Sequence, residues 1–200
     1  IIIAKPRGLG STQGVSAVKR ILRQFGYAPT KKEMPKVGHG GTLDPLAEGV
    51  LPIALGEATK LAGRMLDASK IYVFTITFGT ETATLDTEGA VIATSAVRPS
   101  LAEAEAILPR FAGPIEQVPP AYSALKVDGQ RAYDRARAGE AVELRPRAVT
   151  IFSLSVRAEP VEALHFSSEV KDGPSTSLGR TGLEHITLEA HVSKGTYIRS

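Results

Sequence analysis

The chain contains no cysteine in 200 residues, which excludes disulfide bonds, thiolate metal sites and cysteine nucleophiles. It also lacks any apolar run of the roughly 18 residues that a membrane-spanning helix needs, and it shows no cleavable signal pattern. These absences exclude secreted disulfide scaffolds and predict a cytoplasmic protein.

Histidine is also scarce, and its spacing does not indicate a metal site. The four histidines are His39, His165, His185 and His191. None of them forms a pair of the HExxH type. His185 and His191 lie six residues apart on an expected strand, where they are more simply ordinary strand or surface residues. We expect no bound metal.

Positive charge is concentrated at one end of the chain. Residues 1–36 contain eight Lys or Arg and a single Glu, a net charge of +7, although the whole chain carries only +3. The simpler interpretation is a solvated basic helix face. The alternative is a surface that faces phosphates, because clustered cations release counterions when they bind nucleic acid.

Hydrophobic periodicity predicts strands that interleave with helices, hence an α/β or α+β fold with a mixed sheet. The expected strands are Ile1–Ala4 (buried), 50–55, 70–78, 147–156 and 185–192, the last with alternating apolar residues. The expected helices run from a Ser11 or Thr12 cap to about Phe25, and over 57–66, 101–111 and 130–138. On the first of them, helical spacing places Val15, Val18, Ile21, Leu22 and Phe25 on one apolar face. The Asp128-Gly129 pair predicts a hairpin turn.

Residues 158–182 form a long polar stretch between the last two expected strands. Loops of this length in compact domains are functional or disordered, so we expect a mobile insertion in a hairpin. The chain begins at Ile1 rather than Met and stops at Ser200 within an apparent element. We therefore expect one domain, residues 1–200, that is incomplete at its C-terminus.

The stretch VGHGGTLDPLAEGVL, residues 37–51, places Asp44 shortly after Gly38, Gly40 and Gly41 and directly before Pro45. Asp is a common turn and capping residue, and Asp-Pro is an ordinary start of a turn. The alternative is that a glycine-rich loop presents a single carboxylate to a substrate. The run is no phosphate-binding P-loop, because no Gly-Lys-Ser/Thr follows it.

Five ordered segments, of which this run is the most specific, together resemble the TruB family of tRNA pseudouridine synthases. The other four are KPRGLGSTQGVSAVKR (5–20), KIYVFTITFGTETATLDTEG (70–89), QVPPAYSALKVDGQRAYDRARAG (117–139) and VSKGTYIRS (192–200). The resemblance implies a largely antiparallel sheet flanked by helices. Members of the family continue past the segment that ends at Ser200, and they often add a small C-terminal RNA-binding domain. The 158–182 stretch is a second departure, because it is foreign to the pattern of the family.

The resemblance implies three catalytic residues. Asp44 would be the catalytic carboxylate, attacking either C1′ of the ribose or carbon 6 of the base. Arg199 would be the fixed cation that pairs with Asp44 and keeps it ionised where burial alone would raise its pKa. Tyr72 would lie against the target base, although on residue type alone Tyr72 is a core residue and Arg199 a surface residue.

The resemblance also implies contacts with RNA, because a uridine in a folded loop must leave its stack before it can react. His39, with Gly40 and Thr42, would lie where the loop meets RNA, and His39 would fill the space that the base vacates. The simpler interpretation of His39 is an exposed turn residue. Lys19, Arg20 and Arg23 on the first helix become candidate phosphate contacts.

Three functions follow from these observations. The first is a standalone synthase, a monomer acting on uridine 55 in the T-arm of tRNA without a cofactor, since the isomerisation is redox-neutral. The second is the guide-RNA-dependent relative within a ribonucleoprotein. The third is a catalytically silent RNA-binding or RNA-folding module.

Overall fold

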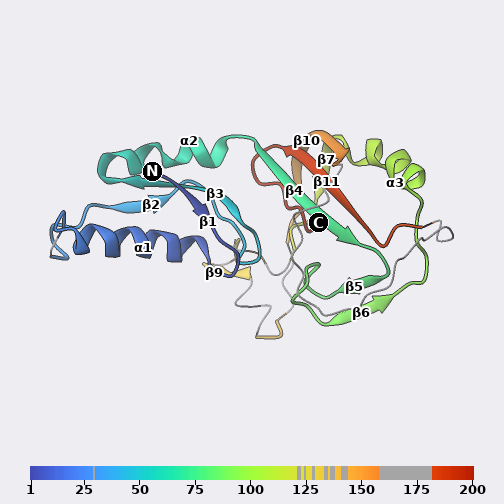
Figure 1. Cartoon of the computed structure of the whole chain (residues 1–200), viewed down its shortest axis with the longest axis horizontal. Helices are drawn as coiled ribbons and strands as arrows, with labels where there is room; N and C mark the ends of the chain where they lie inside the picture. The colour runs from blue at the N-terminus through green and yellow to red at the C-terminus, as the bar shows by residue number, and fades with distance from the viewer. Residues whose placement is uncertain are drawn as a thin grey trace, which may run out of the picture. The chain divides into compact units, whose positions relative to one another are not determined.

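The computed structural model describes residues 1–28, 30–120, 123, 125–127, 129–132, 135, 138–140, 144–157 and 182–200. The chain forms two compact units, Ile1–Ala68 and Ser69–Ser200 (Figure 1). The predicted insertion lies outside the described residues except for Gly182. The expectation of one catalytic domain over 1–200 stays a prediction.

Unit 1 is a three-stranded antiparallel sheet with a long helix packed on it. Its elements are β1 (Ile2–Lys5), α1 (Ser11–Gln24), β2 (Val37–His39), β3 (Gly49–Leu55), a 3-10 helix η1 (Gly56–Leu61) and α2 (Ala62–Asp67). The strand order is β1-β3-β2, with β3 in the centre. The strand that leaves the glycine-rich loop is therefore paired on both edges.

The core of unit 1 lies between α1 and β3. Val15 and Val18 of α1 pack with Leu51 and Ile53 of β3, and all four are buried. Helical spacing places the two valines on one face, and strand alternation places the other pair on the facing side of the sheet. Gly14 allows the close approach, because a Cβ there would lie 3.0 Å from Cδ2 of Leu51.

Two predictions about burial in unit 1 were wrong. Ile21 and Phe25, expected on the apolar face of α1, are 51% and 68% exposed. Of the strand Ile1–Ala4, expected to be buried, Ile1 and Ile2 are exposed, while Lys5 beyond it is 2% exposed. The buried end of β1 thus holds a cation, whose partners are described with the site.

Unit 2 is built on a four-stranded antiparallel sheet of order β4-β11-β10-β7. Its elements are β4 (Lys70–Thr77), β5 (Thr80–Thr82), β6 (Val91–Thr94), α3 (Leu101–Ile107), the 3-10 helix η2 (Leu108–Phe111), β7 (Gly113–Gln117), β8 (Lys126–Val127), β9 (Gln130–Arg131), β10 (Arg147–Val156) and β11 (His185–Val192). Strands β5 with β6, and β8 with β9, form two separate hairpins. All strand pairs among the described residues are antiparallel, in agreement with the expected fold class.

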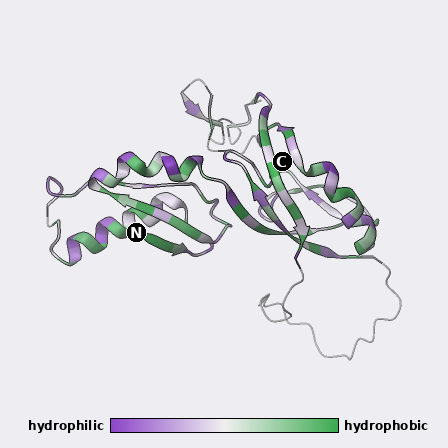
Figure 2. Cartoon of the chain, turned by 90° about the horizontal axis from the view of Figure 1, so that it is seen from above, coloured by the Kyte–Doolittle hydropathy of each residue, from purple (hydrophilic) through white to green (hydrophobic). Residues whose placement is uncertain are grey.

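Strand β11 forms the centre of the core of unit 2. Its alternating residues Ile186, Leu188, Ala190 and Val192, which the sequence pattern predicted on one face, are all buried. Ala104 of α3 packs against the first two, and Ile151 of β10 against the last two. Figure 2 shows hydrophobic stretches along the strands of both units and mixed colouring on α1.

Several element boundaries differ from those predicted. Residues 57–66 and 101–111 each divide into a 3-10 helix and a short α-helix. The expected helix 130–138 begins instead as strand β9, paired with β8 across a turn at Gly129, whose φ is +83°. Asp128 of that turn lies outside the described residues. The strands β2, β5, β6 and β7 were not predicted.

The core of unit 1 yields a test of stability. Replacing Leu51, which is 1% exposed, by Ala should lower the free energy of unfolding by about 2–5 kcal/mol, because a cavity replaces packed side chain. Leu61→Ala, at a position 58% exposed in η1, is the matched control and should change it by less than about 0.5 kcal/mol. Urea denaturation of both variants measures this, and equal effects would contradict the assigned core.

Candidate active site

Asp44 lies on the loop that connects β2 to β3 in unit 1. Its side chain is exposed, and its backbone carbonyl accepts a hydrogen bond from the amide of Ala47 at 3.0 Å. The loop ends at Gly49, whose φ of +129° is open to glycine but strained for other residues. Asp44 is thus an exposed carboxylate on a turn-rich loop, which also carries the exposed Glu48.

The backbone on both sides of Asp44 is hydrogen-bonded to the start of α1 and to the turn that precedes it. The hydroxyl of Ser11 donates to the carbonyl of Leu43 at 3.2 Å and accepts from the amide of Leu43 at 2.9 Å. The amide of Gly8 donates to the carbonyl of Pro45 at 2.8 Å. Ser11 was predicted as a helix cap, but the N-cap is Gly10, and Ser11 is the first helical residue.

Lys5 forms a third attachment beneath the loop. Its Nζ donates to the carbonyls of Leu9 at 2.7 Å, Pro6 at 3.0 Å and Pro45 at 3.5 Å. Burial lowers the pKa of Lys5, while the carboxylates of Asp44 and Glu48 oppose this shift. A cation that is 2% exposed is tolerated because carbonyl oxygens replace its water shell.

His39 and Gly40 occupy the end of β2, where the loop begins. His39 pairs with Ile53 of β3 and is half-buried, so it is a strand residue rather than an exposed turn residue. Its Nδ1 is buried and has no hydrogen-bond partner among the described residues. Gly40 is required by packing, because a Cβ there would lie 2.9 Å from Cβ of Met65. Thr42 is exposed on the loop.

Tyr72 lies on β4 of unit 2, directly opposite Ala190 of β11. It is half-buried and packs against the cluster of Ile151, Ala190 and Val192. Both interpretations from the sequence thus retain support, since the ring contributes to the core while part of the side chain stays accessible. An amphipathic ring with one wet side suits a stacking contact with a base.

Arg199 forms an ion pair with Asp86. Its Nη1 lies 3.0 Å from Oδ2 of Asp86 and donates to the carbonyl of Thr84 at 3.2 Å. The two side chains are only 17% and 21% exposed. Burial alone would raise the pKa of Asp86, but the Thr84 hydroxyl, the amide of Glu88 and the Arg199 guanidinium together hold this pKa below its usual range.

The loop that carries Asp86 is tightly constrained between β5 and β6. Leu85 has a φ of +56°, an uncommon conformation for a residue with a side chain. The hydroxyl of Thr82 donates to the carbonyl of Asp86 at 2.6 Å. Gly89 has no room for a Cβ, which would lie 2.8 Å from the backbone nitrogen of Thr84. These constraints fix the position of the Asp86 carboxylate independently of its ion pair with Arg199.

The backbone of the Arg199 segment is anchored separately by Gln117 of β7. The amide nitrogen of this side chain donates to the carbonyl of Tyr197 at 3.1 Å, and its oxygen accepts from the amide of Tyr197 at 3.1 Å. The hydroxyl of Ser200 donates to the carbonyl of Val118 at 3.0 Å. Arg199 is thus held both through its guanidinium and through its backbone.

The predicted catalytic residues are distributed over the two units. Asp44 belongs to unit 1, and Tyr72 and Arg199 belong to unit 2. The pairing of Arg199 with Asp44 stays a prediction. Asp86 is a partner of Arg199 that sequence reasoning missed. Its signal was the Thr-Leu-Asp-Thr-Glu-Gly run in the quoted segment 70–89.

The three predicted phosphate contacts lie on α1, away from its buried side. Lys19 is half-buried, and Arg20 and Arg23 are exposed. Spacings of three and four residues bring Arg23 next to both of the others on the helix surface. The helix therefore presents a basic strip to solvent, as its sequence predicted.

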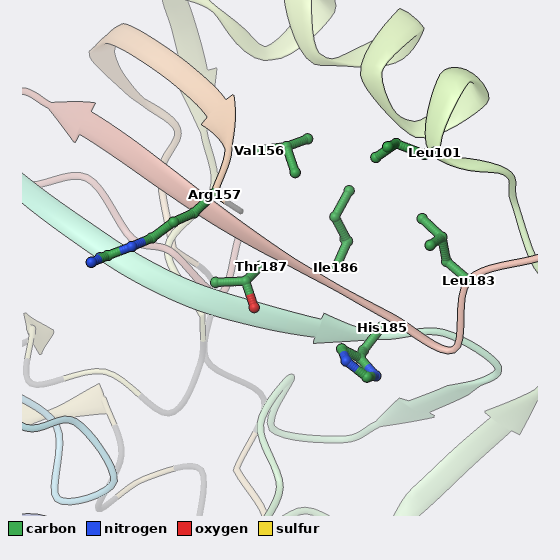
Figure 3. Close-up of a pocket in the computed structure, with 7 residues that line it drawn as sticks. All are labelled: Leu101, Val156, Arg157, Leu183, His185, Ile186 and Thr187. Atoms are coloured by element: carbon green, nitrogen blue, oxygen red, sulfur yellow. The ribbon is translucent and has the colours of Figure 1, made fainter. Parts of the chain in front are cut away.

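A pocket of about 230 Å³ in unit 2 lies between the start of α3 and the strands β10 and β11. Leu101, Val156, Leu183 and Ile186 point toward one another there, and Arg157 extends away (Figure 3). None of the predicted site residues lines it.

The described ranges contain no group of three His, Asp or Glu side chains placed to hold a metal ion. No helix in the same ranges has the length and apolar character to cross a membrane.

Comparison with known families identifies the chain. The sequence model described as "TruB family pseudouridylate synthase (N terminal domain)" matches residues 29–198. The chain belongs to the TruB family. Three curated relatives, each called tRNA pseudouridine synthase B, align with all 200 residues: that of Novosphingobium aromaticivorans at 60% identity, of Zymomonas mobilis at 50% and of Brucella anthropi at 44%.

The TruB chain spans only 59%, 57% and 52% of the length of these three relatives. Among solved structures, the Cbf5-Nop10-Gar1 complex contains a chain that is 26% identical with a TM-score of 0.60, matching all of this chain and 41% of its own. An H/ACA RNP bound to a substrate RNA containing 2'-deoxyuridine gives 23% identity and a TM-score of 0.57 over 39% of its chain, which shows a shared fold.

The ion pair of Asp86 and Arg199 yields a pH-dependent prediction. Asp86→Asn should lower the free energy of unfolding at pH 7 by about 1–3 kcal/mol, because a charge-assisted hydrogen bond is lost and the arginine stays partly buried. The folded-state pKa of Asp86 is depressed, so its contribution is complete above the unfolded-state pKa and disappears as the pH falls through the folded-state value.

The difference between parent and Asp86→Asn should therefore shrink below about pH 4. Urea denaturation at pH 7 and pH 3 measures it. Glu88→Gln, at an exposed position in the same loop, is the control and should have little effect at either pH. A difference for Asp86→Asn that is equal at both pH values would contradict the role of the ion pair.

Proposed function

We propose that this chain carries the catalytic part of an enzyme that isomerises uridine 55 in the T-arm of tRNA to pseudouridine. The observation that carries the proposal is the exposed carboxylate of Asp44 on a loop whose backbone is hydrogen-bonded on both sides. Membership of the TruB family and 60% identity to a relative named tRNA pseudouridine synthase B support the substrate.

The reaction breaks the bond between N1 of uracil and C1′ of ribose and forms a bond from C1′ to carbon 5. Carbon 5 loses its hydrogen as a proton, and N1 ends protonated. A carboxylate suits the first step, as it does in retaining glycosidases, where an oxocarbenium-like sugar develops. Attack of Asp44 on carbon 6 of the base is the second route, and both routes need the carboxylate ionised.

Tyr72 and Arg199 have separate roles in the proposal. Tyr72 stacks on the target base and offers its hydroxyl for proton transfer from carbon 5. Arg199 supplies a fixed positive charge that holds a carboxylate ionised, and a planar guanidinium suits this role because it binds two groups at once. Its contacts with Asp86 and Thr84 use Nη1.

RNA binding in the proposal depends on unit 1. Lys19, Arg20 and Arg23 contact phosphates, which fixes the position of the tRNA without reading its sequence. His39, Gly40 and Thr42 lie beside the flipped base. The Nδ1 of His39 is buried without a hydrogen-bond partner among the described residues, which is costly, and a turn of the ring towards the RNA would expose it.

The standalone enzyme is favoured over the guide-RNA-dependent relative by similarity. Identity to the tRNA synthases reaches 60%, against 26% to the chain in the Cbf5-Nop10-Gar1 complex. A catalytically silent RNA-binding module remains the third candidate, and an assay for pseudouridine formation distinguishes it from the enzyme. A monomeric state, a cytoplasmic location and independence of cofactors stay predictions.

Asp44→Asn should abolish product while leaving tRNA affinity within about twofold, because the amide keeps the size of the side chain but cannot act as a nucleophile. The measurement is digestion and mass spectrometry of an unmodified tRNA T-arm after incubation with each protein. Glu48→Gln, at an exposed acid of the same loop, is the control and should keep product formation. Product from Asp44→Asn at the parent rate would overturn the proposal.

Replacing Lys19, Arg20 and Arg23 together by Gln should weaken tRNA binding and reduce its salt dependence. Each phosphate contact contributes about 0.7–0.9 to the slope of log K against log salt concentration, so the magnitude of the slope should fall by roughly 2–3. Filter binding across salt concentrations measures the slope. Lys60→Gln, at an exposed cation paired with Glu57, is the control, and an unchanged slope in the triple variant would exclude this binding surface.

A further inference from the structure

The hydroxyl of Ser11 uses both its donor and its acceptor on a single residue, Leu43, which precedes Asp44. It donates to the Leu43 carbonyl at 3.2 Å and accepts from the Leu43 amide at 2.9 Å. Ser11 is 4% exposed and lies 32 residues from Leu43 in sequence. A buried hydroxyl with both functions engaged has one orientation, so it fixes the peptide groups on both sides of Leu43.

The serine is not needed at this position to begin the helix. The N-cap of α1 is Gly10, whose amide donates to the side chain of Gln13. The hydroxyl of Ser11 thus makes no cap contact and bonds instead to Leu43 of the loop. Beyond Asp44, the ring of Pro45 restricts the backbone of Asp44, and the Gly8 amide holds the Pro45 carbonyl at 2.8 Å.

We propose that Ser11 is a positioning residue for catalysis, acting on Asp44 through the backbone of Leu43; this rests on the proposed function of Asp44. Ser11 itself touches neither the substrate nor the reacting atoms. A displacement of about 1 Å in a catalytic group costs on the order of 100-fold in rate. Loss of the hydroxyl should therefore lower turnover far more than it lowers affinity for tRNA.

The competing explanation is that Ser11 only stabilises unit 1. Loss of a buried hydrogen-bonded hydroxyl would then reduce the folded fraction, and each folded molecule would react at the parent rate. The two explanations separate when the rate constant is measured per folded molecule at saturating enzyme. Single-turnover formation of pseudouridine in an unmodified tRNA T-arm provides this rate, and filter binding provides the affinity.

The principal variant is Ser11→Ala, with Ser16→Ala as its matched control. Ser16 lies on the same helix, and its exposed hydroxyl bonds only within the helix, to the carbonyl of Thr12 at 3.1 Å. Ser11→Ala should react about 10- to 100-fold more slowly with a dissociation constant within twofold of the parent value, and its Leu43 amide should exchange with solvent faster. Ser16→Ala should match the parent, and Ser11→Thr, which restores a hydroxyl, should regain most of the rate.

Ser11→Ala at the parent rate, or with losses of rate and affinity that are equal, would overturn the inference. If Ser11→Ala does not fold, Ser11→Cys, which keeps the size with a weaker hydrogen-bonding group, carries the same test with an intermediate loss expected. Failure of the proposed function gives a different result, in which the parent and Asp44→Asn are indistinguishable. A parent that requires Asp44 but tolerates Ser11→Ala would leave the function intact and reject only the role of Ser11.

Discussion

A carboxylate on a glycine-rich loop keeps a defined position only when the backbone around it is fixed by something else. In this chain the loop after β2 is fixed by the segment Lys5–Ser11, which donates an ammonium, a backbone amide and a hydroxyl to it. These groups come from the last residue of β1, the turn after it and the first residue of α1, and that segment is positioned in turn by the packing of α1 on β3. The position of Asp44 therefore depends on the core of unit 1, although Asp44 itself is exposed.

The same principle recurs in unit 2 with different groups. Among the described residues, no strand pairs with the segment that carries Arg199, and the side-chain amide of Gln117 bonds to both polar backbone groups of Tyr197 in the way that a neighbouring strand would. The guanidinium is then held by Asp86, whose own loop is fixed by Thr82 and by the lack of room at Gly89. Asp44 and Arg199 are thus each held in part through backbone groups one or two residues away, so these anchors can be lost without any contact to substrate being removed.

Periodicity in the sequence predicted the elements that a hydrophobic face defines. Strands β10 and β11 have the predicted limits, and the alternation in β11 identifies four core residues. Several of the errors occur where polar atoms decide the structure. Lys5 is buried at the end of a strand that was expected to bury isoleucines, because three carbonyl groups gather around its ammonium. Ser11 was predicted as a cap and is used instead on a loop 32 residues away. Partners distant in sequence leave no periodic signal, and the Asp86–Arg199 pair, 113 residues apart, was missed for the same reason.

Buried polar side chains in this protein are therefore informative about function. Lys5, Ser11 and Gln117 are all at most 9% exposed, and each bonds to backbone groups of a segment that carries a candidate catalytic residue. Burying such groups is costly, and packed apolar residues could stabilise the units at least as well. Apolar contacts, however, are not directional, and they leave a glycine-rich loop free to shift along the surface that it covers. Hydrogen bonds to both polar groups of one residue allow a single register. The hydrogen bonds of Lys5, Ser11 and Gln117 fix the backbone beside Asp44 and Arg199, as the proposed function requires, because its rate would depend on the placement of a carboxylate and a guanidinium.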